Sequence, residues 1–273
     1  MRVVTFNICH ASRGRGTAVD NDAVVAACVD LAPDVLALQE VDRGVRRSGR
    51  VDQTALVADA CGMASTFVAA QRLGGGDYGN ALLVRGDVRE VERLSFTGRW
   101  RWGPRDRRAA LVAEVIVDGL GAEPIGERPM DTALVPAKPD HGEPDGGPTH
   151  PRRSLAMTVA VAHLSLAVLD NVPQERLVLE RLVRRPGPHL LVGDLNRRTG
   201  WVRSSAERAG LALVDDDEPT SPAARPRFRI DHVATSGFDV VSIEVVDTGV
   251  SDHRALVVDL APRPSGAPGR EPH

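Results

Sequence analysis

The chain has 273 residues, of which 42% are hydrophobic, and a formal net charge of -3. This length allows one large α/β domain or two small ones. The near balance of charge excludes a strong attraction of the whole molecule to nucleic acid, so any partner must be recognised by a local site. Three cysteines without a CxxC spacing predict reduced thiols rather than a disulfide framework or a zinc knuckle.

The first residues form a strand-like run instead of the apolar stretch and cleavage site of a secretory signal. No apolar segment approaches the roughly 20 residues that are needed to span a bilayer. We therefore expect a cytoplasmic protein without an integral membrane segment, and we expect it to be a monomer.

Short β-branched runs alternate with amphipathic helices along the chain, a pattern that predicts a layered α/β domain. Most of the strand-like runs are apolar on both faces and should be interior strands of covered sheets. The expected strands are residues 2–8, 35–39, 81–84, 110–117, 155–163, 189–192, 230–234 and 255–259. Helices are expected at 22–31, at 52–61, from Pro173 to a stop at Pro186, and after Trp201.

Residues 119–153 are rich in proline and glycine and lack apolar periodicity. Such a segment buries too little apolar surface to offset its ordering entropy, so we predict a flexible insertion between two strands. It is a substrate lid or, as its composition favours, a surface loop without a role in the site. The domain is expected to cover residues 1–262, and residues 263–273 to form a disordered tail.

Polar side chains lie where several of the expected strands end, which is where layered α/β folds place active sites. Asn7 ends the first strand and Glu40 follows the second. Asp194 and Asn196 come after a buried run, where Gly193 allows close approach of a ligand or backbone. A carboxylate and an amide placed in this way are suited to holding a water molecule or a phosphate oxygen.

Three further groups could take part in acid–base chemistry. His163 ends an apolar strand, Asp231 lies in another, and His253 follows Asp252 before the last strand. A histidine with a carboxylate from another strand has what is needed to orient an imidazole and set its charge. The oxygen donors Glu40, Asp194, Asn196 and Asp252 predict Mg²⁺ or Mn²⁺ rather than zinc, because a soft or imidazole-rich set is missing.

Together these stretches resemble the endonuclease/exonuclease/phosphatase superfamily, which includes deoxyribonuclease I, abasic-site endonucleases, neutral sphingomyelinases and inositol-polyphosphate phosphatases. Seven short motifs occur in the family's order and cover residues 2 to about 260. They are Thr5-Phe6-Asn7-Ile8, Leu38-Gln39-Glu40-Val41, Tyr78-Gly79-Asn80-Ala81, Ala162-His163-Leu164, Gly193-Asp194-Leu195-Asn196, Ile230-Asp231-His232-Val233 and Ser251-Asp252-His253-Arg254. The resemblance implies one domain with a four-layer α/β/β/α fold, two packed mixed sheets with helices on the outer faces.

The resemblance also implies roles for single residues. Asn7, Glu40 and Asp252 match the metal site. Asp194 and Asn196 match the pair that positions the attacking water and the phosphate. Asp231 matches the residue that orients the catalytic histidine, His253, while His163 matches a second histidine that contacts the phosphate or protonates the leaving oxygen. The expected activity is hydrolysis of a phosphoester with Mg²⁺ or Mn²⁺, and either Asp194 or His253 activates the water.

Tyr78, Asn80 and Arg108 are expected to contact the substrate. Arg108 lies where many members carry a Glu-Pro-Arg-Gly stretch that this sequence lacks. Deoxyribonuclease has a glutamate at the place of Asn80, where it partners the first histidine, so we expect His163 to lack a charged partner.

The substrate stays open between several classes. A DNA nuclease would use the basic run of Arg43, Arg46, Arg47 and Arg50, and a second run from residue 99 to 108 with interleaved Trp100 and Trp102. Solvated loops are the alternative for both runs. A sphingomyelinase-like lipid phosphodiesterase and a non-catalytic binding module on the same fold are the remaining possibilities.

Overall fold

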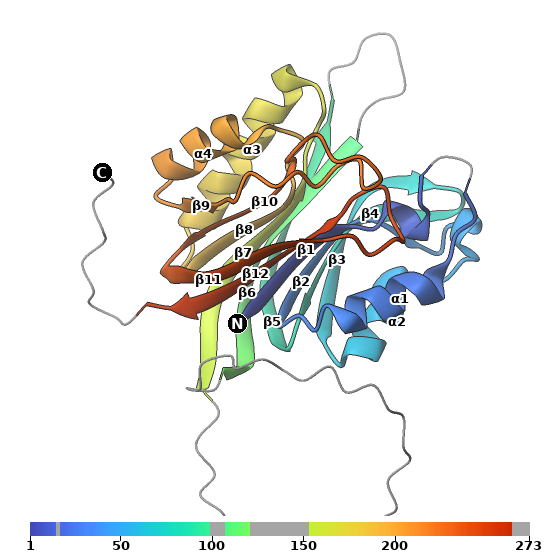
Figure 1. The fold of residues 1–273 in the computed structure, drawn as a ribbon, viewed down its shortest axis with the longest axis horizontal. Helices are drawn as coiled ribbons and strands as arrows, with labels where there is room; N and C mark the ends of the chain where they lie inside the picture. The colour runs from blue at the N-terminus through green and yellow to red at the C-terminus, as the bar shows by residue number, and fades with distance from the viewer. Residues whose placement is uncertain (15–16, 99–106, 121–152, 264–273) are drawn as a thin grey trace, which may run out of the picture.

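Two six-stranded sheets pack face to face at the centre of the molecule, and two pairs of helices cover their outer faces (Figure 1). The computed structural model describes residues 1–14, 17–98, 107–120 and 153–263. Within these residues the four layers are helices, sheet, sheet and helices, which confirms the predicted α/β/β/α sandwich. None of the described helices is long and apolar enough to cross a bilayer.

The first sheet has the strand order β11-β12-β1-β2-β4-β3. Its parallel pair is β1 with β2, and all its other neighbours are antiparallel. The parallel pair places the carboxyl ends of two buried strands at one edge of the sheet. The strands are β1 (Arg2–Asn7), β2 (Val35–Arg43), β3 (Ala64–Leu73), β4 (Gly76–Val84), β11 (Phe238–Val246) and β12 (Ala255–Pro262).

The second sheet has the order β5-β6-β7-β8-β10-β9 and repeats this arrangement, with β7 parallel to β8. Because β10 runs antiparallel to β8, the beginning of β10 meets the end of β8. Strand ends from both sheets can therefore contribute side chains to one site. The strands are β5 (Gly86–Thr97), β6 (Arg107–Leu120), β7 (Arg153–His163), β8 (His189–Asp194), β9 (Ala212–Val214) and β10 (Asp231–Ser236).

The helices bury an apolar stripe against the sheet below them. α1 (Asn21–Asp30) and α2 (Gln53–Cys61) pack on the first sheet, and α3 (Val168–Val183) and α4 (Thr199–Arg208) on the second. Asp20 and Asp52 cap α1 and α2 by accepting backbone N–H groups of the first helical turn. Short 3-10 helices cover Cys9–Ala11 and Arg46–Ser48.

Three layers of apolar side chains hold the sandwich together. The central layer lies between the two sheets and includes Leu82 of β4 and Leu111 of β6, both fully buried. The outer layers lie between each sheet and its helices. Their burial accounts for the two-sided apolar character of the interior strands.

The structure corrects several predicted boundaries. α3 begins at Val168, so Pro173 lies inside the helix, because the first turn exposes Val168 and Leu169 and gives no amphipathic pattern. α4 begins at Thr199 and contains Trp201. The predicted insertion is too wide, since β6 continues to Leu120 and pairs with Arg153; residues 121–152 lie outside the described residues.

The C-terminal boundary also differs from the prediction. Pro262 ends β12, and Arg263 is ordered beyond it, donating its backbone N–H to the carbonyl oxygen of Gly237 and forming an ion pair with Asp239 at 2.8 Å. Only residues 264–273 of the predicted tail lie outside the described residues.

An ion pair joins β1 and β12, which are neighbouring strands of the first sheet. Arg2 donates two hydrogen bonds of 3.0 Å to the carboxylate of Asp259. Burial alone would raise the pKa of Asp259, but the hydrogen bonds from Arg2 and Ser242 outweigh it and lower that pKa. A lowered native pKa stabilises the fold above the unfolded pKa, and this contribution is lost as pH falls through the native pKa.

We expect Asp259→Asn to reduce the free energy of unfolding by about 1–2 kcal/mol at neutral pH, because the paired charge is lost. The difference from the wild-type protein should shrink as the pH falls through the lowered native pKa of Asp259, where the wild-type carboxylate itself becomes protonated. Urea denaturation at neutral pH and at successively lower pH values measures this. A difference that stays constant with pH would contradict the assignment.

Candidate active site

The ends of β1, β7 and β8 bring three of the predicted residues together. Asn7 is the last residue of β1, His163 of β7 and Asp194 of β8. His163 and Asp194 are register partners in the parallel pair, and Asp231 at the start of β10 is the partner of Asp194 on its other side. Three ionisable side chains from neighbouring strands thus share one edge of the second sheet.

Asn7 connects the two sheets at this edge. Its side chain is fully buried, and its amide nitrogen donates to Glu40 Oε1 at 3.3 Å and to Asp194 Oδ2 at 3.1 Å. Its side-chain oxygen accepts the backbone N–H of Cys9 at 3.0 Å. Asn7 therefore fixes the separation between a carboxylate of the first sheet and one of the second.

Glu40 reaches the site because β2 is interrupted by a bulge. The pairing of β2 with β4 shifts register between Leu38 and Val41, and Glu40 has a φ of 59°. In a regular strand Glu40 would share the face of Leu38, which packs against the outer helices. The irregularity turns the carboxylate toward Asn7, as bulges beside active sites commonly do.

Several neighbours keep the Glu40 carboxylate charged. Burial alone would raise its pKa, but the ring of His10, with Nδ1 3.9 Å from Glu40 Oε2, acts in the opposite direction. Hydrogen bonds from Asn7 and Tyr78 add to this effect, so the pKa lies well below its ordinary value. The predicted residue Tyr78 therefore contacts the site through Glu40.

Asp231 holds the imidazole of His253. Its Oδ2 accepts hydrogen bonds from His253 Nδ1 at 2.9 Å and from Thr220 Oγ1 at 2.6 Å. Burial alone would lower the pKa of His253, but the charge and hydrogen bond of Asp231 outweigh it and raise that pKa to about 10. The other ring nitrogen, Nε2, faces Asp194 Oδ2 at 3.9 Å.

Ser251 attaches the loop that carries Asp252 and His253 to β1. Its hydroxyl donates to the carbonyl oxygen of Asn7 at 2.6 Å and accepts the backbone N–H of His253 at 3.2 Å. This places residues from the C-terminal part of the chain beside the first strand.

Asp194 lies at the centre of the group. It is 1% exposed, accepts the backbone N–H of Asn196 at 3.0 Å and lies 3.4 Å from His163 Nε2. Burial and the neighbouring charge of Asp231 raise its pKa to about 7. Asn196 follows with a φ of 51° and donates its amide to the carbonyl oxygen of Leu164 at 2.9 Å.

His163 has a charged partner, so the expectation that it would lack one is wrong. The guanidinium of Arg108 contacts His163 Nε2. Burial and the charge of Arg108 hold the pKa of His163 well below its ordinary value. The partner is a cation rather than a carboxylate, and it keeps the imidazole neutral.

Asn80 is 1% exposed and connects the two sheets. Its amide nitrogen donates to the carbonyl oxygen of Ala109 at 2.8 Å, next to Arg108 in β6. This hydrogen bond orients β6 beside β4, and the role of Asn80 in substrate binding stays a prediction.

A family model describing the endonuclease/exonuclease/phosphatase family matches residues 4–253. The match includes every site residue named above and all of the described strands except β12 and the start of β1. The chain belongs to the endonuclease/exonuclease/phosphatase family. The resemblance seen in seven sequence motifs is thereby confirmed.

Several solved structures are similar to this chain over almost its whole length. A family member from Beutenbergia cavernae is 26% identical, with a TM-score of 0.67, covering 96% of this chain and 72% of that one. ANGEL2, a 2′,3′-cyclic phosphatase, is 13% identical with a TM-score of 0.63 over 95% of this chain and 94% of that one. The human Nocturnin catalytic domain is 15% identical, with a TM-score of 0.60, covering 96% of this chain and 94% of that one. The last two show a shared fold.

Curated relatives cover a smaller part of the chain. Two UPF0294 proteins of Vibrio vulnificus are 29% identical over 114 residues, which is 39% of this chain and 39% of each relative. The match thus spans less than half of those proteins. Members of the endonuclease/exonuclease/phosphatase family include hydrolases that act on phosphoesters and generally use divalent metals.

The donor set of this family member fits a divalent cation. Glu40 and Asp252 supply carboxylates and Asn7 an amide, which are ligand types that hard cations prefer. Burial raises the pKa of Cys9 to about 12, and the charges of Asp252 and Glu40 add to the effect, so the thiol lies beside both carboxylates. Asp194, Asp231 and His253 form a second group whose ligand atoms all lie within 4.8 Å of one another.

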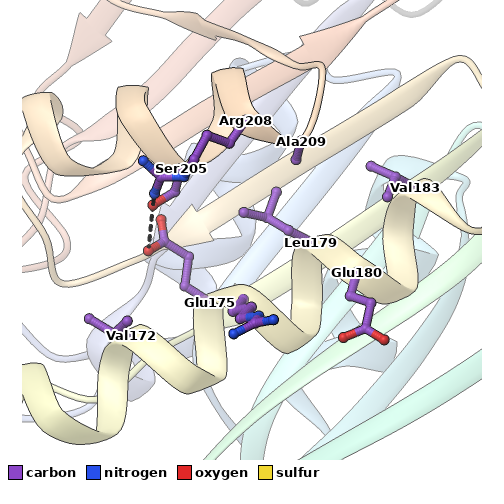
Figure 2. A pocket seen from close by; sticks show the side chains of 9 residues that line it. Val172, Glu175, Leu179, Glu180, Val183, Ser205, Arg208 and Ala209 are labelled. Carbon is purple, nitrogen blue, oxygen red and sulfur yellow. Dashed lines mark hydrogen bonds between the residues drawn. The ribbon is translucent and has the colours of Figure 1, made fainter.

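A separate groove of about 440 Å³ lies between α3 and α4 (Figure 2). Figure 2 shows Glu175 pointing from α3 toward Ser205 of α4, and the carboxylate also forms an ion pair with Arg197 at 2.5 Å. None of the site residues named above lines this groove. We therefore do not assign the reaction to it.

Sequence reasoning missed four residues that contact the site. Thr220 lies in an irregular segment, and its contact with Asp231 exists only in the folded structure. Ser251 was part of a recognised motif, but its bond to Asn7 depends on the fold. Cys9 was interpreted as a structural thiol and His10 was not considered, although both follow Asn7 directly.

Proposed function

We propose that this family member is a divalent-metal-dependent hydrolase that cleaves a phosphoester by in-line attack of water. The observation that carries the proposal is the position of Asn7, whose amide bonds both Glu40 and Asp194. It connects a candidate cation site on the first sheet with a candidate water-activating group on the second.

On the cation side, Asn7, Glu40 and Asp252 would hold Mg²⁺ or Mn²⁺. When bound, the cation neutralises the phosphate and stabilises the leaving oxygen. Tyr78 would support cation binding, because it lowers the pKa of Glu40 and so keeps this carboxylate charged.

On the water side, Asp194 and His253 Nε2 lie 3.9 Å apart, so one water molecule could hydrogen-bond both. Because the pKa of His253 is raised to about 10, its ring is protonated at neutral pH, and Asp194 is the group that can take the proton of the water. Asp231 keeps the ring of His253 in the orientation this requires. Asn196 is held next to Asp194, since its backbone N–H donates to Asp194 Oδ1 and its side-chain nitrogen donates to the carbonyl oxygen of Leu164. Of the two candidates for the general base, the proposal therefore assigns Asp194 to that role and protonated His253 to orienting the water molecule and stabilising negative charge.

The phosphate would be bound by His163 and Arg108. Arg108 contacts the ring of His163, and a guanidinium is well suited to contacting phosphate oxygens. Neutral His163 next to this cation can donate a hydrogen bond to a phosphate oxygen or to the leaving group.

Two of the four arginines in the first basic run form ion pairs within the protein, which weakens the case for a long DNA-binding surface. Arg47 donates two hydrogen bonds of 2.8 Å to Asp42, and Arg43 lies 4.0 Å from Asp77. Paired arginines contribute less to phosphate binding than solvated ones. Residues 99–106 of the second run lie outside the described residues.

One observation favours a lipid phosphodiester as a second candidate substrate. Leu166, Val168 and Leu169 follow His163 closely and are 70%, 64% and 85% exposed. Apolar side chains exposed together mark interaction surfaces with proteins or membranes.

Metal dependence is the direct test of the proposed function. We expect hydrolysis to stop in excess EDTA and to return with Mg²⁺ or Mn²⁺, since the cation neutralises the phosphate. The panel would contain bis-p-nitrophenyl phosphate, plasmid DNA, abasic duplex, inositol phosphates and sphingomyelin vesicles. Turnover that continues unchanged in EDTA would refute the role of the metal, and no turnover of any phosphoester would favour a non-catalytic binding module.

Asp231→Asn tests the orientation of His253. We expect kcat to fall roughly 10- to 100-fold, because an amide can donate to the imidazole and stabilise the wrong tautomer. The matched control is Asp239→Asn, the same change at an exposed position of β11. If Asp231→Asn keeps the wild-type kcat while the protein stays folded, His253 does not act through Asp231.

A further inference from the structure

Cys9 and His10, which the proposed mechanism does not use, lie beside Glu40. The sulfur of Cys9, a ring nitrogen of His10 and a carboxylate oxygen of Glu40 all lie within 4.8 Å of one another. The charges of Asp252 and Glu40 both raise the pKa of the Cys9 thiol, so the sulfur also lies near Asp252. A sulfur and a nitrogen donor thus adjoin Glu40, and the sulfur lies near the second carboxylate assigned to the cation.

The backbone adopts an unfavourable conformation to place these two side chains. Cys9, His10 and Ala11 have φ values of 44°, 49° and 64°, three successive left-handed residues without a glycine. Such a conformation is unfavourable for a residue with a side chain, and strain of this kind collects at ligand-binding positions. The hydrogen bond from the backbone of Cys9 to Asn7 Oδ1 holds the segment in place.

His10 also has an unsatisfied ring nitrogen. Among the described residues, His10 Nδ1 is buried without a hydrogen-bond partner, and its distance of 3.9 Å from Glu40 Oε2 is too long for a hydrogen bond. A buried polar atom without a partner destabilises the fold, because it has lost its hydrogen bonds to water. A cation between the ring and the carboxylate would give this nitrogen a partner.

We propose that Cys9 and His10 are further ligands of the cation held by Glu40 and Asp252, and that this site therefore prefers Zn²⁺ or a similar borderline-soft cation to Mg²⁺. The inference rests on the proposed function, which places a cation at Glu40. Ligands about 2.0–2.3 Å from one Zn²⁺ are at most about 4.6 Å apart, and His10 Nδ1 and Glu40 Oε2, at 3.9 Å, already lie within that limit. As the sulfur–metal bond forms, the S–H bond breaks and its proton passes to solvent.

This donor set changes the metal expected from the sequence. Oxygen donors alone favour Mg²⁺ or Mn²⁺, and the sequence had been interpreted as lacking a soft or imidazole-containing set. Thiolate and imidazole ligands favour Zn²⁺ and Co²⁺ over Mg²⁺ because these cations form more covalent bonds with sulfur and nitrogen.

Cobalt titration tests the inference without measuring activity. Co²⁺ is added to the metal-free full-length protein while absorbance is recorded, because a thiolate ligand produces a charge-transfer band in the near ultraviolet. We expect this band in the wild-type protein, its loss in Cys9→Ser and its retention in Cys61→Ser. Cys61 is a partly exposed thiol at the end of α2, which makes it the matched control.

A second variant allows the inference to be tested even if Cys9→Ser does not fold. In His10→Asn the imidazole is lost, while asparagine tolerates the left-handed backbone. We expect the dissociation constant for Zn²⁺, measured by competition with a chromophoric chelator, to rise roughly tenfold or more. Mg²⁺ affinity should change little, because Mg²⁺ would bind through the carboxylates.

Three results would overturn the inference. The first is Co²⁺ binding without the charge-transfer band, and the second is a band that persists in Cys9→Ser. In both cases a cation still binds, so the proposed metal-dependent function stands. The third is the absence of any divalent-cation binding to the wild-type protein, which would overturn the inference together with the metal dependence of the proposed function.

Discussion

Asp194→Asn should lower kcat/KM by roughly 10³- to 10⁴-fold while the protein stays folded. The amide keeps the volume of the carboxylate and can still accept the backbone N–H of Asn196. It carries no negative charge and cannot take a proton from water. It also cannot attract the His253 ring, whose Nε2 lies 3.9 Å away. Steady-state kinetics on the phosphoester that is hydrolysed fastest, together with a thermal melt, measure the effect.

Asp87→Asn is the matched control for this substitution. Asp87 is exposed in β5, where it pairs only with a neighbouring arginine among the contacts that the described residues make. We expect wild-type kinetics from it, because surface ion pairs of this kind contribute little. If Asp194→Asn retained the turnover of the control, Asp194 would not take part in the reaction.

Gly193→Ala should destabilise the fold by more than about 4 kcal/mol or prevent folding. Gly193 has a φ of 142°, and a Cβ added there would lie 1.9 Å from the carbonyl oxygen of Ala162 in β7. That oxygen belongs to the backbone of a fully buried strand and cannot rotate away. The strands β7 and β8 would have to separate, which would break the parallel pairing next to Asp194. Urea denaturation and soluble yield measure the loss.

Gly200→Ala is the corresponding control in the same part of the chain. A Cβ added at Gly200 meets no atom within 4 Å, and the residue lies in α4. Alanine is the better helix former, so we expect a gain of up to about 1 kcal/mol. Equal stability of Gly193→Ala and the wild-type protein would show that the two strands can move apart at little cost.

The interior of the fold could be predicted from the sequence, whereas its edges could not. The eight predicted strands correspond to the interior strands of the two sheets, where apolar residues face a layer on both sides. The strands without a prediction are β3, β5, β9 and β11, which form the four edges of the described sheets. Edge strands are half solvated and carry charges, as in Arg89-Glu90-Val91-Glu92, so their pattern resembles that of a loop.

The site could be predicted where its residues stand at the ends of apolar strands, because the ends of neighbouring strands lie close together in the fold. Asn7, His163 and Asp194 each end an apolar run, and the structure brings them together. The direction of Glu40 could not be predicted, because it depends on a bulge that sequence alternation does not reveal. Contacts across the two sheets, such as that of Thr220 with Asp231, depend on packing and leave no local pattern.

The apolar layer between the two sheets limits which substitutions the protein can accept in its interior. Side chains such as Leu82 and Leu111 lie between the sheet that carries Glu40 and the sheet that carries Asp194. Their bulk acts as a spacer that sets how far apart the two halves of the site stand. A substitution there would alter catalytic alignment without touching a reactive group, because interiors are close-packed and transmit strain. Selection on activity therefore extends into the hydrophobic interior, and variation at these positions should be limited by geometry as well as by stability.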